Sequence, residues 1–277
     1  MTHPALTKGA TAVVTGGASG IGLAAAQAFS RLGLNLVIAD LGADRLAAAA
    51  ARIGGQVLAV ETDVSDPDAV AQLADAVAQR FGGADVLMNN AGIGPDSAIG
   101  GPAEPWQRIM AVNMWGVIHG THAFLPQMQQ RGRPGLIINT GSKQGITTPP
   151  GNPAYNMSKA AVKVFTEALE HDLRNRPGSL ISAHLLIPGF VFTGLTAGST
   201  TQKPAAAWTA DQTVDFMLTS LGNGDFYILC PDNDVPRGLD EKRIAWAAGD
   251  IVENRPPLSR WHPAHADAFK AYAKSPA

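Results

Sequence analysis

A tyrosine, a lysine and a serine are spaced so that they could act together on an alcohol or a carbonyl. Tyr155 and Lys159 stand four residues apart, so a helix over 153–175 would place both on one face. A phenol is a poor base at neutral pH because its unperturbed pKa is about 10. A lysine cation beside it would favour the phenolate, and Ser142, at the end of an apolar run, could bond the substrate oxygen. This set suits proton transfer to or from oxygen, although the tyrosine–lysine spacing alone also fits an ordinary helix pair.

A glycine-rich turn near the N-terminus could hold a phosphate. The apolar run 11–15 leads into the sequence TGGASGIG at residues 15–22, and an alanine-rich segment, 21–32, follows. A strand, a glycine turn and a helix start present backbone N–H groups to an anion, and glycine permits close backbone approach. The spacing differs from the G-x-G-x-x-G fingerprint of the longer Rossmann enzymes. A simple tight strand-to-helix connection is the alternative interpretation.

Taken in order along the chain, these segments resemble the short-chain dehydrogenase/reductase family, in its compact single-domain branch. The resemblance covers roughly residues 7–230 and rests on Thr15, Gly16, Gly20, Ile21, Gly22, Asp63, Val64, Asn89, Asn90, Ala91, Gly92, Asn113, Ser142, Tyr155, Lys159, Pro188 and Gly189. It implies a nicotinamide cofactor and a catalytic tetrad of Asn113, Ser142, Tyr155 and Lys159. It also implies that Asn113 disturbs its helix and holds a water that links Lys159 to solvent.

The position of Asp40 favours NAD over NADP. Asp40 ends the predicted second strand, where an acid takes the ribose hydroxyls and repels a 2′-phosphate. The nearest basic residue is Arg45, and a helix cap is the alternative role for Asp40. By resemblance, the cofactor-binding residues are Gly16, Ser19, Gly20, Ile21, Gly22, Asp40, Asp63, Val64, Asn90, Ala91, Gly92, Tyr155, Lys159, Pro188, Gly189, Val191 and Thr193.

The predicted reaction is hydride transfer between a secondary alcohol or ketone and NAD. The substrate would contact Ser142, Gln144, Tyr155 and Phe190, in a pocket whose wall also includes Ile93, Gly94 and Phe192. Two phenylalanines suggest an apolar or aromatic substrate, and Lys143 is the candidate for binding an anionic group. The alternatives are an NADPH-dependent carbonyl reductase, a lyase or epimerase with bound NAD, and an inactive nucleotide-binding regulatory protein.

Composition excludes several other classes. The 277 residues carry a net charge of −2, which gives no basic face for nucleic acid or an anionic membrane. The single cysteine, Cys230, excludes an internal disulfide, and no apolar run reaches membrane-spanning length. His119 and His122 lack a third ligand, so no metal site is expected. A cytoplasmic protein whose partner is a small-molecule alcohol or ketone is therefore predicted.

Short apolar runs alternate with helical patterns, which predicts a doubly wound, Rossmann-like α/β fold with a parallel sheet. The expected strands are 11–15, 35–39, 56–61, 86–89, 135–140, 180–187 and 226–230, and the expected helices are 21–32, 43–53, 67–81, 105–130, 153–175 and 210–221. Residues 1–277 are interpreted as one domain, with 231–277 as a C-terminal extension that shields the substrate loop, 190–208. By resemblance, helices 105–130 and 153–175 pair between subunits of a homotetramer, with a dimer as the fallback.

Overall fold

The predicted parallel sheet is confirmed. The computed structural model describes residues 2–198 and 200–275, and its seven strands lie in the order β3-β2-β1-β4-β5-β6-β7. The strands are β1 (Thr11–Thr15), β2 (Asn35–Asp40), β3 (Val57–Glu61), β4 (Val86–Asn89), β5 (Gly135–Thr140), β6 (Ile181–Ile187) and β7 (Tyr227–Leu229). All neighbouring strands pair in parallel, and the strand order reverses between β1 and β4. In such sheets ligands bind at the carboxyl ends of the strands beside this reversal.

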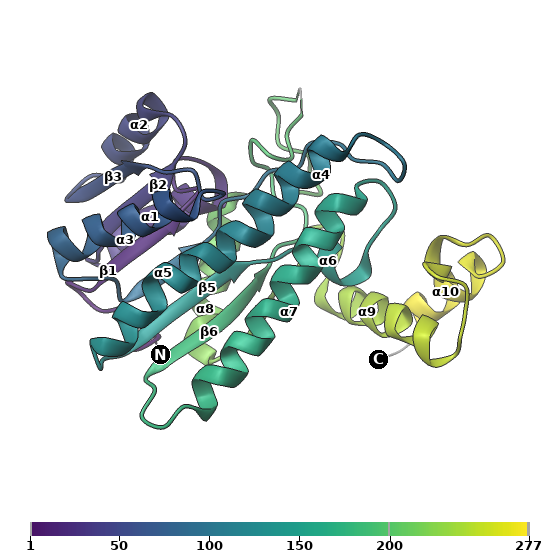
Figure 1. Ribbon diagram of the computed structural model, residues 1–277. Helices are drawn as coiled ribbons and strands as arrows, with labels where there is room; N and C mark the ends of the chain where they lie inside the picture. The colour runs from purple at the N-terminus through teal and green to yellow at the C-terminus, as the bar shows by residue number, and fades with distance from the viewer. Residues whose placement is uncertain (1, 199, 276–277) are drawn as a thin grey trace.

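Helices cover both faces of the sheet and enclose two large hydrophobic cores, with a smaller cluster around Val162 and Leu185 (Figure 1). The first core contains residues of α1 (Gly20–Arg31), α2 (Ala43–Ile53) and α8 (Ala210–Asn223). The second contains residues of α3 (Pro67–Phe81), α5 (Gly116–Gln130) and α7 (Pro153–Asn175). Alternate strand residues enter opposite cores, since Val14 packs into the first and Val13 into the second. The central strands are therefore apolar on both faces, as expected for a parallel sheet.

The long helix predicted over 105–130 is interrupted. It divides into α4 (Ala103–Ile109), a π-helical segment η1 (Met110–Trp115) and α5. Asn113 lies inside the π-helical segment and is fully buried. A π-helical segment adds a residue to the turn and often marks a functional site, which agrees with the disturbed helix implied by the family resemblance.

The C-terminal extension is more helical than its sequence suggests. It contains α9 (Arg237–Val252), a 3₁₀ turn η2 (Ser259–Trp261) and α10 (Ala266–Lys274). Trp246 packs against Phe269 and Tyr272 of α10, with ring centroids 5.4 and 5.3 Å away, and its Nε1 donates to Ser259 Oγ. Residues 264–274 have helical spacing in the sequence, with Ala268 and Tyr272 four apart, which predicts α10. The sequence does not predict α9, because only Asp240 and Trp246 of this helix are buried and no apolar stripe marks it.

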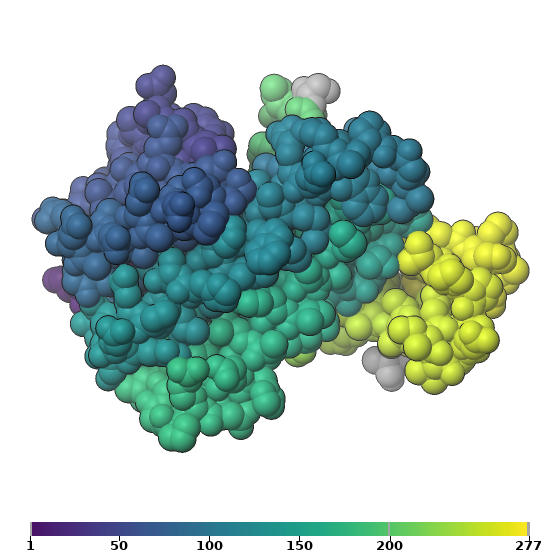
Figure 2. Space-filling model, viewed as in Figure 1, coloured from purple at the N-terminus to yellow at the C-terminus, as the bar shows by residue number. Residues whose placement is uncertain are grey.

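The predicted position of this extension is only partly right. Its first residues do reach the substrate loop, since Asn233 bonds the backbone of Ala205, Ala206 and Ala207. The start of α9 packs against α6 (Gln144–Thr147), whereas η2 and α10 project from the body of the molecule, with α10 packed against α9 and η2 (Figures 1 and 2). The distal half therefore does not cover the substrate loop of its own chain.

Candidate active site

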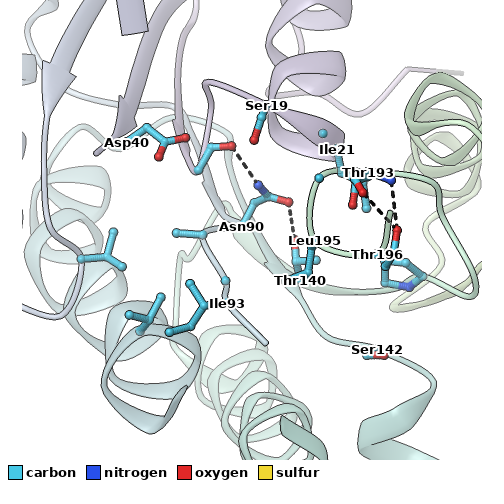
Figure 3. A pocket seen from close by; sticks show the side chains of 18 of the residues that line it. Ser19, Ile21, Asp40, Asn90, Ile93, Thr140, Ser142, Thr193, Leu195 and Thr196 are labelled. Atoms are coloured by element: carbon cyan, nitrogen blue, oxygen red, sulfur yellow. Dashed lines mark hydrogen bonds between the residues drawn. The ribbon is translucent and has the colours of Figure 1, made fainter. Parts of the chain in front are cut away.

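The carboxyl ends of the strands surround one cavity of about 310 Å³. Of the cofactor-binding residues predicted from the sequence, all but Gly22 line it. Figure 3 shows Asp40 and Ser142 at opposite sides of this cavity, with Asn90 between them. The cavity therefore connects the end of β2 with the end of β5, as an extended dinucleotide would require.

The glycine-rich turn is shaped by close backbone contacts. Gly16 and Gly20 have φ values of 64° and 53°, in the left-handed region that favours glycine. A Cβ on Gly22 would lie 2.2 Å from the Gly16 carbonyl oxygen, so Gly22 supports the turn from behind instead of lining the cavity. Ser19 is the N-cap residue of α1 and makes no side-chain cap bond, so its hydroxyl is available at the cavity wall. The α1 N-terminus thus faces the cavity, where its backbone N–H groups can hold a phosphate.

Asp40 does not cap α2, whose N-cap residue is Gly42. One carboxylate oxygen accepts from Ala18 N at 3.0 Å, and the other accepts from Leu41 N at 2.8 Å. The Arg45 Nη2 lies 3.4 Å from the second oxygen, and Arg45 also lines the cavity. This end of the cavity therefore presents a guanidinium as well as a carboxylate, which weakens the sequence argument against NADP.

Lys159 is held beneath Tyr155. Its Nζ donates to Thr140 O at 2.7 Å and lies 5.8 Å from the centroid of the Tyr155 ring. Burial lowers the pKa of Lys159 to about 8. Burial also raises the pKa of Tyr155, and a hydrogen bond with Ser142 opposes that rise. Without a bound cofactor, desolvation of the phenolate outweighs the hydrogen bond with Ser142, so the net pKa of Tyr155 is raised. The effect of Lys159 on the tyrosine pKa stays a prediction.

The Asn113 side chain is fully used by the protein. Its Oδ1 accepts from Ile93 N at 2.8 Å, and its Nδ2 donates to Ile93 O at 2.9 Å and to Ser158 Oγ at 3.1 Å. A Cβ on Gly92 would lie 3.5 Å from Asn113 Oδ1 and 3.7 Å from Lys159 Nζ. Asn113 therefore fixes the backbone beside Lys159, a link that the sequence does not reveal.

Asp63, which lines this cavity, forms a local turn. Its Oδ1 accepts from Ser65 N at 2.9 Å and from Ser65 Oγ at 2.7 Å. The N-cap residue of α3 is Asp66, whose side chain accepts from Asp68 N. Asp63 is thus free of a capping role and its neighbour Val64 lines the same wall.

A second cavity of about 400 Å³ shares Ser142 and Tyr155 with the first. Its lining residues are Gly94, Ser142, Lys143, Gln144, Asn152, Tyr155, Pro188, Gly189, Phe190, Leu195, Thr196 and Asp232. All four predicted substrate contacts line it, as does Gly94. Ile93 lines the first cavity instead, and Phe192 is not among the lining residues of either. Sequence reasoning missed Asn152, Leu195, Thr196 and Asp232, although Asn152 just before the predicted helix is a recognisable cap.

Lys143 is not free to bind an anion. Its Nζ lies 3.2 Å from Asp232 Oδ2 and 2.5 Å from Asp240 Oδ2. Asp232 Oδ2 also accepts from Phe190 N at 3.2 Å. Burial raises the pKa of Asp240, and Lys143 opposes that rise. Both carboxylates come from the C-terminal extension, far along the chain from Lys143, so spacing could not have revealed these ion pairs.

The remaining candidates carry no chemistry in this structure. His119 Nδ1 bonds Val64 O at 3.0 Å, and its ring stacks on Trp115. Burial raises the pKa of Cys230 to about 12, which keeps the thiol protonated. Within residues 2–198 and 200–275, no cluster of three metal-ligating side chains occurs, and no helix is long and apolar enough to span a membrane.

Comparison with known proteins adds sequence relatives and solved structures. Residues 10–204 match the family described as short chain dehydrogenase. The chain is 34% identical over 262 residues to 1-deoxy-11-beta-hydroxypentalenate dehydrogenase of Streptomyces exfoliatus, covering 90% of this chain and 93% of that protein. It is 32% identical to a short chain dehydrogenase/reductase from Burkholderia phymatum solved in complex with NAD, with a TM-score of 0.81 and coverage of 90% and 96%. An alcohol dehydrogenase from the archaeon Thermococcus sibiricus, complexed with 5-hydroxy-NADP, is 28% identical, with a TM-score of 0.70 and coverage of 78% and 91%.

Proposed function

Because this chain belongs to the short-chain dehydrogenase/reductase family, we propose that it interconverts an apolar or aromatic secondary alcohol and its ketone with NAD as the preferred cofactor. The chain is an oxidoreductase, and a nicotinamide cofactor supplies the centre that accepts or donates the hydride. The observation that carries the proposal is that Ser142 and Tyr155 line both cavities. In this proposal their hydroxyls would reach a substrate in the second cavity beside a cofactor in the first.

The cofactor cavity fits a dinucleotide in its chemistry. The α1 N-terminus and Ser19 would hold the phosphates, and Asp40 would take the ribose hydroxyls. Pro188, Gly189, Val191 and Thr193 line the same cavity, and Thr193 lies beside the glycine turn, near Ile21 (Figure 3). These assignments, like those of Asp63, Val64 and 90–92, follow the family resemblance and the lining of the cavity.

Each catalytic residue has a proposed task. In the direction of oxidation, Tyr155 Oη takes the hydroxyl proton of the alcohol while Ser142 Oγ bonds the same oxygen. Lys159, anchored to Thr140 O, provides positive charge below the phenol when it is protonated. Asn113 holds the Ile93 backbone and thereby positions the chain beside Lys159.

The cofactor preference has a direct test. The ratio of kcat/KM for NAD to that for NADP is expected to favour NAD by about tenfold or more, because Asp40 bonds ribose hydroxyls and repels a phosphate. Replacing Asp40 by Ser, with Arg45 retained, should move the ratio toward NADP. A wild-type enzyme equally efficient with both cofactors would contradict the assignment.

Arg45 is the observation that favours the second candidate, an NADPH-dependent carbonyl reductase. Its guanidinium lines the cavity beside Asp40 and could pair with a 2′-phosphate if the ion pair with Asp40 opened. The substitution Arg45→Gln separates the two candidates. It should leave the kcat/KM for NAD nearly unchanged and should reduce the kcat/KM for NADP strongly only if this candidate is right.

The apolar or aromatic substrate is supported by Phe190 and Leu195, which are exposed apolar side chains in the wall of the second cavity. The Streptomyces relative is named for a hydroxypentalenate, so a hydroxy acid is the rival class. A panel of neutral aryl alcohols and hydroxy acids, with Tyr155→Phe as the inactive control, tests this assignment.

Assembly, location and domain organisation stay proposals. Trp115 on η1 and Met157 and Val164 on α7 are 48%, 47% and 63% exposed, which supports pairing of these helices in a homotetramer, or in a dimer as the fallback. We retain the single domain over 1–277 with an extension at 231–277, and a cytoplasmic location stays a prediction.

A further inference from the structure

We propose that the Lys143–Asp232–Asp240 cluster makes this enzyme select neutral alcohols and reject hydroxy acids. The inference rests on the proposed function, because it names the substrate class of the second cavity. It concerns residues outside the catalytic tetrad, and two of them belong to the C-terminal extension.

The cluster forms part of the wall of the substrate cavity. Lys143 directly follows Ser142, and both Lys143 and Asp232 line the cavity. A Cβ on Gly189 would lie 2.5 Å from Asp232 Oδ2 and 2.7 Å from Lys143 Nζ, so glycine lets the cluster approach the backbone at 189. Within the cluster, Lys143 is the sequence neighbour of the catalytic Ser142. Lys143 and Asp232 also lie against Gly189, the residue before Phe190.

The lysine charge is already compensated within the protein. The exposed fractions of the side chains are 15% for Lys143, 6% for Asp232 and 5% for Asp240. Arg243 Nη1 lies 4.0 Å from Asp240 Oδ1, so two cations and two carboxylates balance one another. Because these groups are mostly removed from water, a substrate carboxylate would have to displace an ion pair to reach Lys143.

A carboxylate in the cavity would also meet Asp232. Among the described residues that line this cavity, Lys143 and Asp232 are the charged ones, and the others are apolar or neutral polar. Gln144 is exposed and can donate to or accept from a neutral polar group. The wall thus offers a substrate carboxylate no free cation but accommodates a neutral substrate, which is selection against an anion that would be left unpaired.

A pair of matched substrates tests the proposal. The pair is 4-(1-hydroxyethyl)benzoate and its methyl ester, which carry the same secondary alcohol and differ in charge. In the wild-type enzyme, kcat/KM for the ester should exceed that for the carboxylate by about tenfold or more. Asp240→Asn gives the cluster a net positive charge and should narrow this ratio by about tenfold.

Asp240 is the better residue to substitute in this test, because Asp232 also accepts hydrogen bonds from backbone N–H groups. The Asp232 oxygens accept from the backbone N–H groups of Phe190, Asp234 and Val235, whereas Asp240 contacts the side chains of Lys143 and Arg243. The matched control is Asp234→Asn, which removes the same charge from an exposed side chain two residues beyond Asp232. It should leave the ester-to-acid ratio of kcat/KM unchanged. Adding Lys143→Met to Asp240→Asn should abolish the improvement in kcat/KM for the carboxylate.

The outcomes separate this inference from the proposed function. If the ester is oxidised but Asp240→Asn changes the ratio no more than Asp234→Asn does, the selection role is wrong and the proposed function stands. If neither alcohol is oxidised, the proposed substrate class is wrong. The inference is then decided by binding of 4-acetylbenzoate and its methyl ester to the wild-type protein in the presence of NAD, measured by calorimetry. Ester affinity about tenfold higher supports the inference, and equal affinities or a preference for the acid overturn it.

Discussion

At the scale of single residues, the proposed chemistry depends on the phenol oxygen of Tyr155, whose buried environment disfavours the charged phenolate form. Burial raises the pKa of Tyr155 and lowers that of Lys159 to about 8. The two shifts have the same cause, since a buried site disfavours both the phenolate and the ammonium. A bound, positively charged partner in the first cavity would favour the phenolate, so we infer that the tyrosine becomes an effective base only in the loaded enzyme.

The substitution Tyr155→Phe tests this assignment. It removes the oxygen that carries the proton and keeps the ring, so kcat should fall by about 10²–10⁴-fold. NADH affinity, measured by fluorescence titration, should change by less than about twofold, which corresponds to under 0.5 kcal/mol. A variant that kept a tenth of the wild-type kcat would exclude Tyr155 as the acid–base group.

Gly22 offers a second test at the residue scale. A Cβ there would lie 2.2 Å from the Gly16 carbonyl oxygen and 2.6 Å from Asn90 Nδ2, so Gly22→Ala must shift the glycine turn. We expect the variant to unfold at a lower temperature and to lose at least about tenfold in NADH affinity, because overpacking costs about 1–3 kcal/mol. Gly238→Ala is the control, since a Cβ there meets no atom within 4 Å. Equal behaviour of the two variants in thermal unfolding and NADH titration would refute the packing argument.

At the scale of elements, the sequence predicts what depends on local pattern and misses what depends on distant contacts. All seven strands lie within two residues of their predicted bounds, because apolar runs bounded by turns specify them locally. Periodicity does not predict the π-helical segment at Asn113, whose side chain is held by hydrogen bonds to the backbone of the distant Ile93. Helix α9 and the ion pairs of Lys143 were missed for the same reason, because their partners lie in distant parts of the chain.

The start of β6 carries an acid-sensitive hydrogen-bond chain outside the active site. His184 Nδ1 must donate to the Asp225 carbonyl at 2.8 Å, so its Nε2 accepts from Ser182 Oγ at 3.0 Å. Ser182 Oγ then accepts from His3 Nε2 at 3.0 Å, and His3 Nδ1 accepts from Ala5 N at 3.2 Å. Both imidazoles are neutral in this arrangement, and protonating His3 at Nδ1 sets an N–H against the Ala5 N–H and breaks that hydrogen bond.

The hydrogen bonds that join His3, Ser182 and His184 predict that the folded protein loses stability in mild acid. Burial, and repulsion by His184, lower the pKa of His3 to about 4, and burial lowers the pKa of His184 although Glu170 and Asp225 oppose that shift. A histidine with a lowered folded-state pKa stabilises the protein above its unfolded pKa of about 6.5 and loses that contribution as the pH falls toward 4. The free energy of unfolding should thus drop between pH 6.5 and 4, by on the order of 1–2 kcal/mol from His3 after allowance for its partial exposure.

Urea unfolding across this pH range checks the prediction. His3→Gln should flatten the pH dependence, because the titrating imidazole is gone. His171→Gln, at an exposed histidine of α7, is the control and should leave the wild-type slope intact. The same slope in all three proteins would show that other groups cause the acid sensitivity.

At the scale of the whole molecule, two exposed apolar regions compete as assembly surfaces. One is the face formed by η1 and α7, which presents Trp115 and Val164. The other is the projecting extension, where Ile251 and Val252 are 86% and 84% exposed. Large apolar side chains exposed together commonly mark an interface, so each region predicts a different partner contact.

We expect the η1–α7 face to form the main subunit interface. This face lies on η1 and the long helix α7, which pack against each other, whereas α10 and the end of α9 project from the body (Figure 1). Val164→Glu places a charge on the first face and should reduce the predicted homotetramer to a smaller species in multi-angle light scattering. Ile251→Glu is the matched change on the extension and should leave the tetramer intact. Because Val164 lies apart from both cavity linings, the smaller species should still bind NADH, which separates loss of assembly from loss of folding. If Ile251→Glu alone disrupts the assembly, the extension, and not the η1–α7 face, joins the subunits.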